Sequence, residues 1–142
     1  EIERLGHRER QEAPILVAED SILLSKMIQD ALNKSGYVNV RMFSDGQALW
    51  SYLESLRDVG DLDERVRLVI TDIEMPQMDG HRLTKLIKSD KQFTKLPVVI
   101  FSSMINEEMH RKGKELGANE QLTKPEIGRL VEIIDHLLAI QV

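Results

Sequence analysis

Five short apolar runs, each followed by an amphipathic segment, restrict the fold of this chain more than any other feature. Residues 15–18 (I-L-V-A) and 97–101 (P-V-V-I-F) are apolar throughout, which is typical of strands buried on both faces of a sheet. The segments between the runs carry apolar residues at helical spacing. We therefore predict an α/β protein with a (βα)5 doubly wound, five-stranded parallel sheet and helices on both faces. The expected strands are residues 15–18, 38–43, 68–70, 97–101 and a short fifth strand that ends near residue 123.

The first 13 residues differ from the rest of the chain. They are mostly charged and lack a sustained apolar face, so we expect residues 1–13 to be a linker or tail from an upstream domain, helical at most in part. The chain begins without a methionine, which fits a piece of a longer protein. The predicted domain is residues 14–142.

Several helix ends are marked by local signals. Ser44 and Gln47 have the spacing of a capping box, with Ser44 as the N-cap. Asp79 is expected to cap the helix that follows the third strand. Pro125 suits the first position of the last helix. Residues 57–65 are expected to form a polar loop.

The composition excludes several classes of protein. The net charge of −5 argues against a nucleic-acid-binding domain, which normally presents a basic face. There is no cysteine, so disulfides and thiolate metal sites are excluded, and a cytoplasmic location is expected. No apolar run approaches the ~18 residues that a membrane span needs. The histidines show no ligand spacing and are expected on charged faces; they are His7, His81, His110 and His136.

Polar residues follow four of the five predicted strands. In an open parallel sheet, ligands bind beyond the carboxyl ends of the strands, at the point where the strand order reverses. These residues are therefore expected to line one crevice. They are Glu19 and Asp20 after the first strand, Asp72 after the third, Ser102 after the fourth and Lys124 after the fifth.

Three carboxylates in one crevice call for a cation. Two charges ~4 Å apart at an effective dielectric constant of ~20 repel by about 4 kcal/mol. Oxygen ligands without histidine or cysteine select Mg²⁺, Mn²⁺ or Ca²⁺, and Mg²⁺ suits a site that shares ligands with a phosphate. Ser102 offers a hydroxyl donor and Lys124 a positive charge, and both suit phosphoryl oxygens. The combination indicates phosphorylation of Asp72.

Each of these residues also has a plain structural interpretation. Glu19 and Asp20 could cap the first helix, Ser102 could be a loop hydroxyl, and Lys124 could be a solvated lysine before a proline. Taken one at a time, these interpretations are as good as the functional ones. Their coincidence at four strand ends favours a site.

Residues 14–140 resemble the receiver domain of two-component response regulators, whose doubly wound sheet is flavodoxin-like. The spacing of the matching motifs also resembles the family. The motifs are the acidic pair Glu19-Asp20, the stretch D-I-E-M-P-Q-M-D-G at 72–80, the hydroxyl residue Ser102 and Lys124-Pro125.

The resemblance implies a role for each residue. Asp72 would accept a phosphoryl group from a histidine kinase, and the domain would catalyse only its own phosphorylation and dephosphorylation rather than act as an enzyme on other substrates. Ser102 and Lys124 would contact the phosphoryl group, and the bond between Lys124 and Pro125 would be cis. The ligands of Mg²⁺ would be Glu19, Asp20, Asp72 and the backbone carbonyl of Glu74.

One position departs from the family pattern. Receivers usually carry an aromatic residue three positions before the lysine, whose rotation reports phosphorylation, and here that switch position is Gln121. The usual switch is therefore in doubt, and the sparsely apolar helix expected at 105–116, which Gly113 interrupts, becomes a candidate for the mobile element. Glu74 and Met104 flank the expected water path and should tune the phosphorylated lifetime.

Two segments resemble the receiver domains of CheV chemotaxis coupling proteins. They are S-S-M-I-N-E-E-M-H at 102–110 and L-T-K-P-E-I at 122–127. In that family the receiver follows a scaffold domain that couples chemoreceptors to the histidine kinase CheA. The resemblance implies a CheA-like kinase and a chemoreceptor scaffold as partners, with no nucleic acid bound by this domain and no insertion into the membrane.

Other functions remain open from the sequence. The domain could belong to a single-domain or transcriptional response regulator. A flavodoxin-like FMN-binding protein would share the fold, but Glu19 and Asp20 stand where a phosphate cradle is needed. A phosphatase of the haloacid dehalogenase type would carry D-x-D after its first strand, whereas the D-x-E here follows the third. A pseudo-receiver is disfavoured because no catalytic position is missing.

Overall fold

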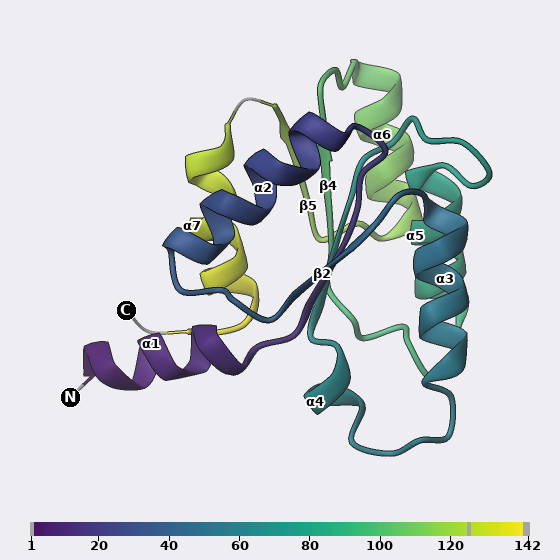
Figure 1. The fold of residues 1–142 in the computed structure, drawn as a ribbon. Coiled ribbons are helices and arrows are strands. Elements are labelled where there is room, and N and C mark those ends of the chain that lie inside the picture. The colour runs from purple at the N-terminus through teal and green to yellow at the C-terminus, as the bar shows by residue number, and fades with distance from the viewer. Residues whose placement is uncertain (1, 125, 141–142) are drawn as a thin grey trace.

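The computed structural model of the protein describes residues 2–124 and 126–140, and side-chain burial from residue 6 onward (Figure 1). The described part contains one five-stranded sheet. Its strands are β1 (Ile15–Ala18), β2 (Val40–Phe43), β3 (Leu68–Thr71), β4 (Val98–Ser102) and β5 (Glu120–Thr123). The helices are α1 (Ile2–Glu12), α2 (Ile22–Lys34), α3 (Gly46–Ser55), α4 (Leu62–Arg65), α5 (Gly80–Ser89), α6 (Glu107–Leu116) and α7 (Ile127–Leu137).

All strand pairs are parallel, and the strand order is β2-β1-β3-β4-β5. The order reverses between β1 and β3, where ligands bind in sheets of this kind. In this pair Ala18 lies opposite Thr71, so the residues that follow both strands leave the sheet side by side. The predicted doubly wound parallel sheet is confirmed.

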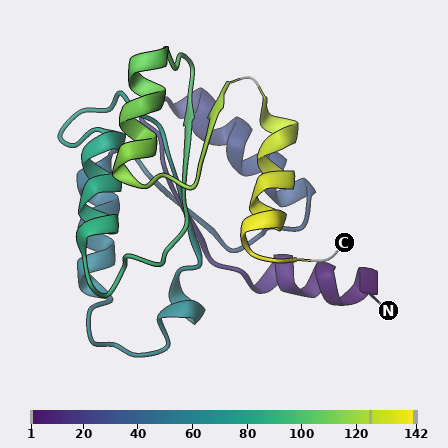
Figure 2. The same ribbon diagram turned by 180° about the vertical axis from the view of Figure 1, so that it is seen from behind.

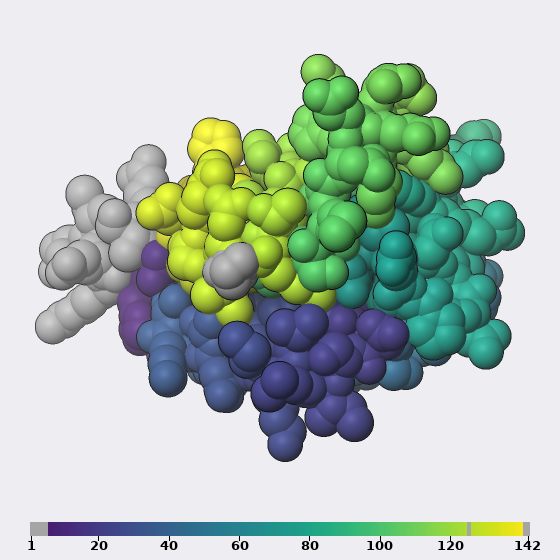
Figure 3. Space-filling model, turned by 90° about the horizontal axis from the view of Figure 1, so that it is seen from above, coloured from purple at the N-terminus to yellow at the C-terminus, as the bar shows by residue number. Residues whose placement is uncertain are grey.

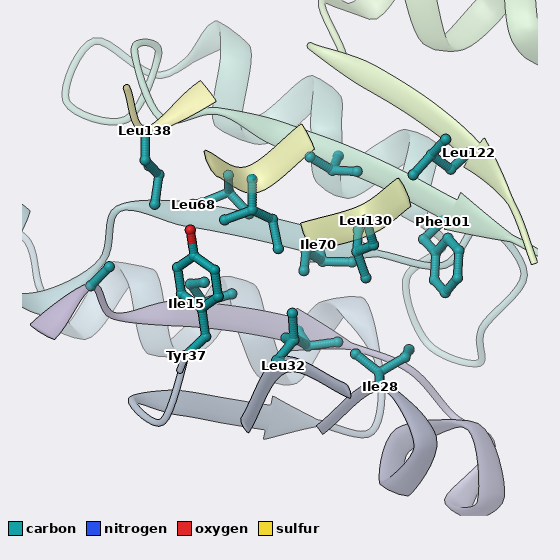
Figure 4. Close-up of a cluster of buried hydrophobic side chains, with 14 of the residues drawn as sticks. Ile15, Ile28, Leu32, Tyr37, Leu68, Ile70, Phe101, Leu122, Leu130 and Leu138 are labelled. Atoms are coloured by element: carbon teal, nitrogen blue, oxygen red, sulfur yellow. The ribbon is translucent and has the colours of Figure 1, made fainter. Parts of the chain in front are cut away.

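Two hydrophobic cores hold helices against the two faces of the sheet. Alternate residues of the strands point to opposite faces: Ile15 and Val17 to one, Leu16 and Ala18 to the other. Helices α2 and α7 cover the first face, and α3 and α5 cover the second (Figures 1 and 2). Figure 4 shows the first core, with side chains from the strands interleaved with those of α2 and α7. This burial on both faces explains why the strands are apolar throughout.

Three local predictions were wrong or outside the described residues. The second strand is shorter than expected because its pairing with β1 begins at Val40. The expected polar loop at 57–65 contains the short helix α4. Pro125, expected at the first position of the last helix, lies outside the described residues.

The N-cap of α3 is Asp45 rather than Ser44. The Asp45 carboxylate accepts a hydrogen bond from the backbone N–H of Ala48 at 2.8 Å. The reason for the shift is a tertiary contact: the N–H of Gly46 donates to the carbonyl oxygen of Met78 at 3.2 Å. A Cβ atom on Gly46 would lie 2.5 Å from that oxygen, so this position requires glycine. The contact ties the start of α3 to the loop that follows β3.

No helix in the described ranges combines the length and the apolar character that crossing a bilayer would require.

His81 is buried, contrary to the expectation that the histidines lie on charged faces. His81 lies in α5 and is only 5% exposed. Helix α5 packs beside α6. Within the described part of the chain, no group offers its Nε2 atom a hydrogen bond. Burial lowers the pKa of His81, and the charge of Lys112 lowers it further, although Asp79 and the backbone of Met109 act in the opposite direction.

We predict that the free energy of unfolding decreases as the pH falls below the ordinary histidine pKa of 6.5. The unfolded chain binds a proton at His81 near that pH, whereas the folded protein resists it until a lower pH, so acid favours unfolding. Urea unfolding at a series of pH values from about 7.5 to 5 measures the effect. His81→Leu should flatten this dependence and His136→Gln, at an exposed site, should keep it; equal slopes for both variants would contradict the assignment.

Candidate functional site

Three acids converge at the carboxyl ends of β1 and β3. Carboxylate oxygens of Glu19, Asp20 and Asp72 lie within 4.8 Å of one another. Backbone hydrogen bonds fix two of them: the N–H of Glu19 donates to Phe43 and that of Asp72 to Ala18, both at 3.0 Å. These bonds continue the sheet one residue beyond the strands, so the positions of Glu19 and Asp72 follow from the strand register.

None of these three acids caps a helix. Ser21 is the N-cap of α2, and its hydroxyl accepts from the N–H of Leu24 at 3.2 Å. Asp79 is the N-cap of α5, as predicted, and accepts from the N–H of Arg82 at 2.8 Å. The plain structural interpretation of the acidic residues therefore fails, because other side chains satisfy both helix ends.

Lys124 joins two of the acids. Its Nζ atom forms a short ion pair with Oε1 of Glu19 and lies 3.3 Å from Oδ2 of Asp72. The side chains of Lys124 and Glu19 are only 7% and 2% exposed, so this pair is largely shielded from water. Burial raises the pKa of Glu19, opposed by its hydrogen bonds to Lys124 and Ser21, while the charge of Asp72 raises it further.

The Asp72 carboxylate is oriented by hydrogen bonds and remains accessible. Its Oδ1 atom accepts from the N–H of Ile73 at 2.7 Å, and its Oδ2 atom faces Lys124. The hydroxyl of Thr71 donates to the carbonyl oxygen of Asp72 at 2.8 Å. With its side chain 11% exposed, Asp72 presents a fixed carboxylate to the cleft above it.

The acids lie in a cleft of about 420 Å³ at this end of the sheet. Figure 3 shows the molecule from this end, where segments of purple, teal, green and yellow colour meet. The cleft draws on the ends of four strands, β1, β3, β4 and β5. Its lining residues are Glu19, Asp20, Ser21, Leu24, Asp72, Glu74, Ser102, Ser103, Met104 and Lys124.

The β4 side of the cleft carries a hydroxyl group. Ser102 is 3% exposed, and its Oγ atom lies 3.5 Å from the carbonyl oxygen of Met104, the limit of a hydrogen bond. The carbonyl oxygen of Ser102 accepts from the N–H of Lys124 at 2.7 Å, which holds the two residues together. Glu74 and Met104 are exposed at the rim. The bond between Lys124 and Pro125 lies outside the described residues.

Gln121, the expected switch position, does not line the cleft. Its side chain turns to α6, where Nε2 donates to the carbonyl oxygen of His110 at 2.8 Å. A Cβ atom on Gly113 would overlap with the Gln121 amide, so the glycine that was expected to interrupt this helix makes room for it. Among the described residues the Oε1 atom of Gln121 has no hydrogen-bond partner.

Ser21 also contributes to the site, although it was not among the residues predicted from the sequence. Besides capping α2, its backbone N–H donates to Oε2 of Glu19 at 3.1 Å and thereby orients that carboxylate. A serine directly before an apolar run is an N-cap signal that could have identified it.

Comparison with known proteins identifies relatives of this chain. The response regulator receiver domain family matches residues 15–135. The chemotaxis protein CheV3 of Helicobacter pylori is 31% identical over 134 residues, which cover 93% of this chain but only 43% of CheV3. The expected resemblance to CheV receivers is thus confirmed.

Two solved structures share the fold. The Mn²⁺-bound form of the response regulator Rcp1 is 26% identical with a TM-score of 0.75, and the match covers 92% of this chain and 96% of Rcp1. The phosphorylated cyanobacterial phytochrome response regulator RcpA gives the same identity and TM-score, with 92% and 97% covered.

We predict that Gly80→Ala destabilises the protein. A Cβ atom there would overlap with the carbonyl oxygen of Asp72, and the Gly80 N–H donates to Ile73 at 2.8 Å, so the loop could not fold back on β3. Overpacking of this kind costs about 1–3 kcal/mol, measured by urea unfolding.

The matched control is Gly128→Ala. Nothing lies within 4 Å of a Cβ atom at Gly128 in α7, so alanine should stabilise the protein by about 0.5–1 kcal/mol through helix propensity. Equal effects of the two substitutions would show that the contact at Gly80 is not restrictive.

Proposed function

This chain belongs to the response regulator receiver domain family, and from this premise we propose that Asp72 accepts a phosphoryl group from a histidine kinase. The observation that carries the proposal is the fixed, accessible Asp72 carboxylate between two further acids and Lys124. A carboxylate that only capped a helix or only faced the solvent would not need these neighbours. The domain would catalyse only its own phosphorylation and dephosphorylation.

The acidic cluster supports a bound Mg²⁺. Its donors are carboxylate oxygens, and none of the three acids caps a helix. Hard divalent cations suit such oxygen donors best. Among structures of similar fold, Rcp1 has been solved with Mn²⁺ bound. In the proposal, the ligands are Glu19, Asp20, Asp72 and the backbone carbonyl of Glu74. When bound, the ion neutralises the negative charge that gathers on the phosphoryl oxygens.

The proposed reaction is a single displacement at phosphorus. An oxygen of Asp72 attacks the phosphohistidine, a P–O bond forms, the P–N bond breaks, and the imidazole leaves with the electron pair and takes a proton. Lys124 would turn from Glu19 to a phosphoryl oxygen, and Ser102 would donate its hydroxyl to another. Positioning and charge neutralisation supply most of the rate in transfers of this kind.

Similarity to CheV3 supports a chemotaxis role. We propose a CheA-like histidine kinase as the phosphoryl donor, a cytoplasmic location, and a chemoreceptor scaffold contacted through an upstream domain. The net charge of −5 supports a domain that does not bind nucleic acid. The alternative is the receiver of a single-domain or transcriptional response regulator, for which the same cleft would serve.

Two regions would control the signal. Glu74 and Met104, exposed at the rim of the cleft, would set how readily water reaches the acyl phosphate and hence its lifetime. Gln121 would report the state of the site through its hydrogen bond to α6 in place of an aromatic rotation.

The first test is phosphorylation in the presence of Mg²⁺ and acetyl phosphate, followed by intact mass. We expect one phosphoryl adduct in the unmodified protein and none in Asp72→Asn. Asp79→Asn is the matched control: it changes an acid of the same loop outside the cleft, and asparagine also caps helices well, so its adduct should persist. An adduct that survives Asp72→Asn would overturn the proposal.

The second test separates Gln121 from the chemistry. Because its side chain lies outside the cleft, Gln121→Ala should change the phosphorylation rate by less than about two-fold, whereas loss of the bond to His110 should speed amide exchange in α6. Rate measurements by mass and hydrogen exchange give both readouts. A large loss of rate would instead place Gln121 in the active site.

A further inference from the structure

An arginine of α1 is held at the end of the domain opposite the cleft. Figures 1 and 2 show α1 below the sheet, beside the lower ends of α2 and α7. The whole of α1 precedes residue 15, where the match to the receiver family begins. The contacts of Arg10 are therefore not explained by the phosphoryl chemistry.

The guanidinium of Arg10 is bound on three sides. Its Nε atom donates to Oδ1 of Asp135 at 3.1 Å, and Nη2 forms an ion pair with Oδ2 of the same carboxylate. Its Nη1 atom donates to the carbonyl oxygen of Ser35 at 2.8 Å. Its carbon Cζ lies 5.7 Å from the centre of the Tyr37 ring. A two-pronged carboxylate contact, a carbonyl and an aromatic face are together suited to the planar fork of arginine.

The residues that receive Arg10 are themselves fixed. Tyr37 is fully buried in the first core, and its hydroxyl donates to Asp135. Burial and the Asp135 carboxylate raise the pKa of Tyr37, so the hydroxyl remains a donor. The backbone carbonyl of Asp135 accepts from Ile140 at 2.8 Å, which anchors the end of α7.

The turn before β2 is shaped to receive α1. Gly36 has a φ of +104° and is buried, so it takes a backbone conformation that other residues rarely adopt. A Cβ atom there would touch the ring of His7 at 3.4 Å and the Arg10 side chain at 3.5 Å. The glycine thus permits the turn, and α1 packs against it at ordinary van der Waals distance.

We propose that Ser35, Tyr37 and Asp135 form an arginine-binding notch that α1 fills in cis through Arg10. The notch is an interaction surface for a helix that presents an arginine. Docking there makes α1 a part of the folded domain and fixes the orientation, relative to the sheet, of any segment joined to the N-terminal end of α1. The segment expected to be a linker, in which residues 2–12 form α1, would then be a docked connector.

Hydrogen exchange of the full chain tests the notch without any need for phosphorylation, so its outcome is independent of the Asp72 test. Arg10→Ala should speed the exchange of the α1 amides by about ten-fold or more, since undocked helices of this length are marginal in water. Asp135→Asn should have a similar effect because it removes the charge that Arg10 meets. The matched control is Arg8→Ala, an exposed arginine of the same helix, which should leave the α1 amides protected.

Arg10→Lys separates a specific notch from general charge attraction. Lysine keeps the charge but lacks the fork that reaches Asp135 and Ser35 together, so protection should stay close to that of Arg10→Ala. Full protection in Arg10→Lys would reduce the notch to a simple ion pair and overturn the proposal.

Two further outcomes would also overturn the proposal. One is equal exchange of the α1 amides in Arg10→Ala and Arg8→Ala. The other is a loss of protection in β3 as large as that in α1, which would show that α1 does not dock as a separate element.

Discussion

The crowding of negative charge at the ends of β1 and β3 is the constraint on which the rest of the site depends. Parallel pairing of these strands leaves Glu19 and Asp72 side by side, and the burial of Glu19 reduces the water that screens the two charges. Lys124 offsets this repulsion from the end of β5, across the cleft. A buried pair of this kind contributes little net stability, because desolvation cancels much of the attraction. What the pair maintains is the arrangement of the charged groups around Asp72.

The geometry is maintained by backbone contacts around the cleft rather than by packing within it. Gly80 lets the loop after β3 fold back on Asp72, and Gly46 brings α3 against Met78 in the same loop. Ser21 orients Glu19 while it caps α2. The open cleft therefore sits on a rigid frame, as a site that depends on positioning requires.

Two polar contacts of this structure lie away from the cleft. Gln121 joins β5 to α6 by an amide hydrogen bond, so the link between the site and that helix is directional and easily exchanged with water. Arg10 joins α1 to the lower ends of α2 and α7. The first contact links the strand that ends at the cleft to α6, and the second links α1 to the body of the domain.

The sequence by itself determined the doubly wound sheet and most residues of the cleft, because strand periodicity and the polar residues at strand ends are local patterns that the parallel topology brings together. Only the tertiary structure decided the features that depend on contacts distant in sequence. The start of α3 follows from Gly46 meeting Met78, and His81 is buried because α6 packs beside α5. The charged first segment docks because the carboxylate of Asp135, 125 positions away, accepts a hydrogen bond from Arg10. A local sequence pattern does not reveal such contact partners, because each contact forms only when elements distant in the sequence pack together.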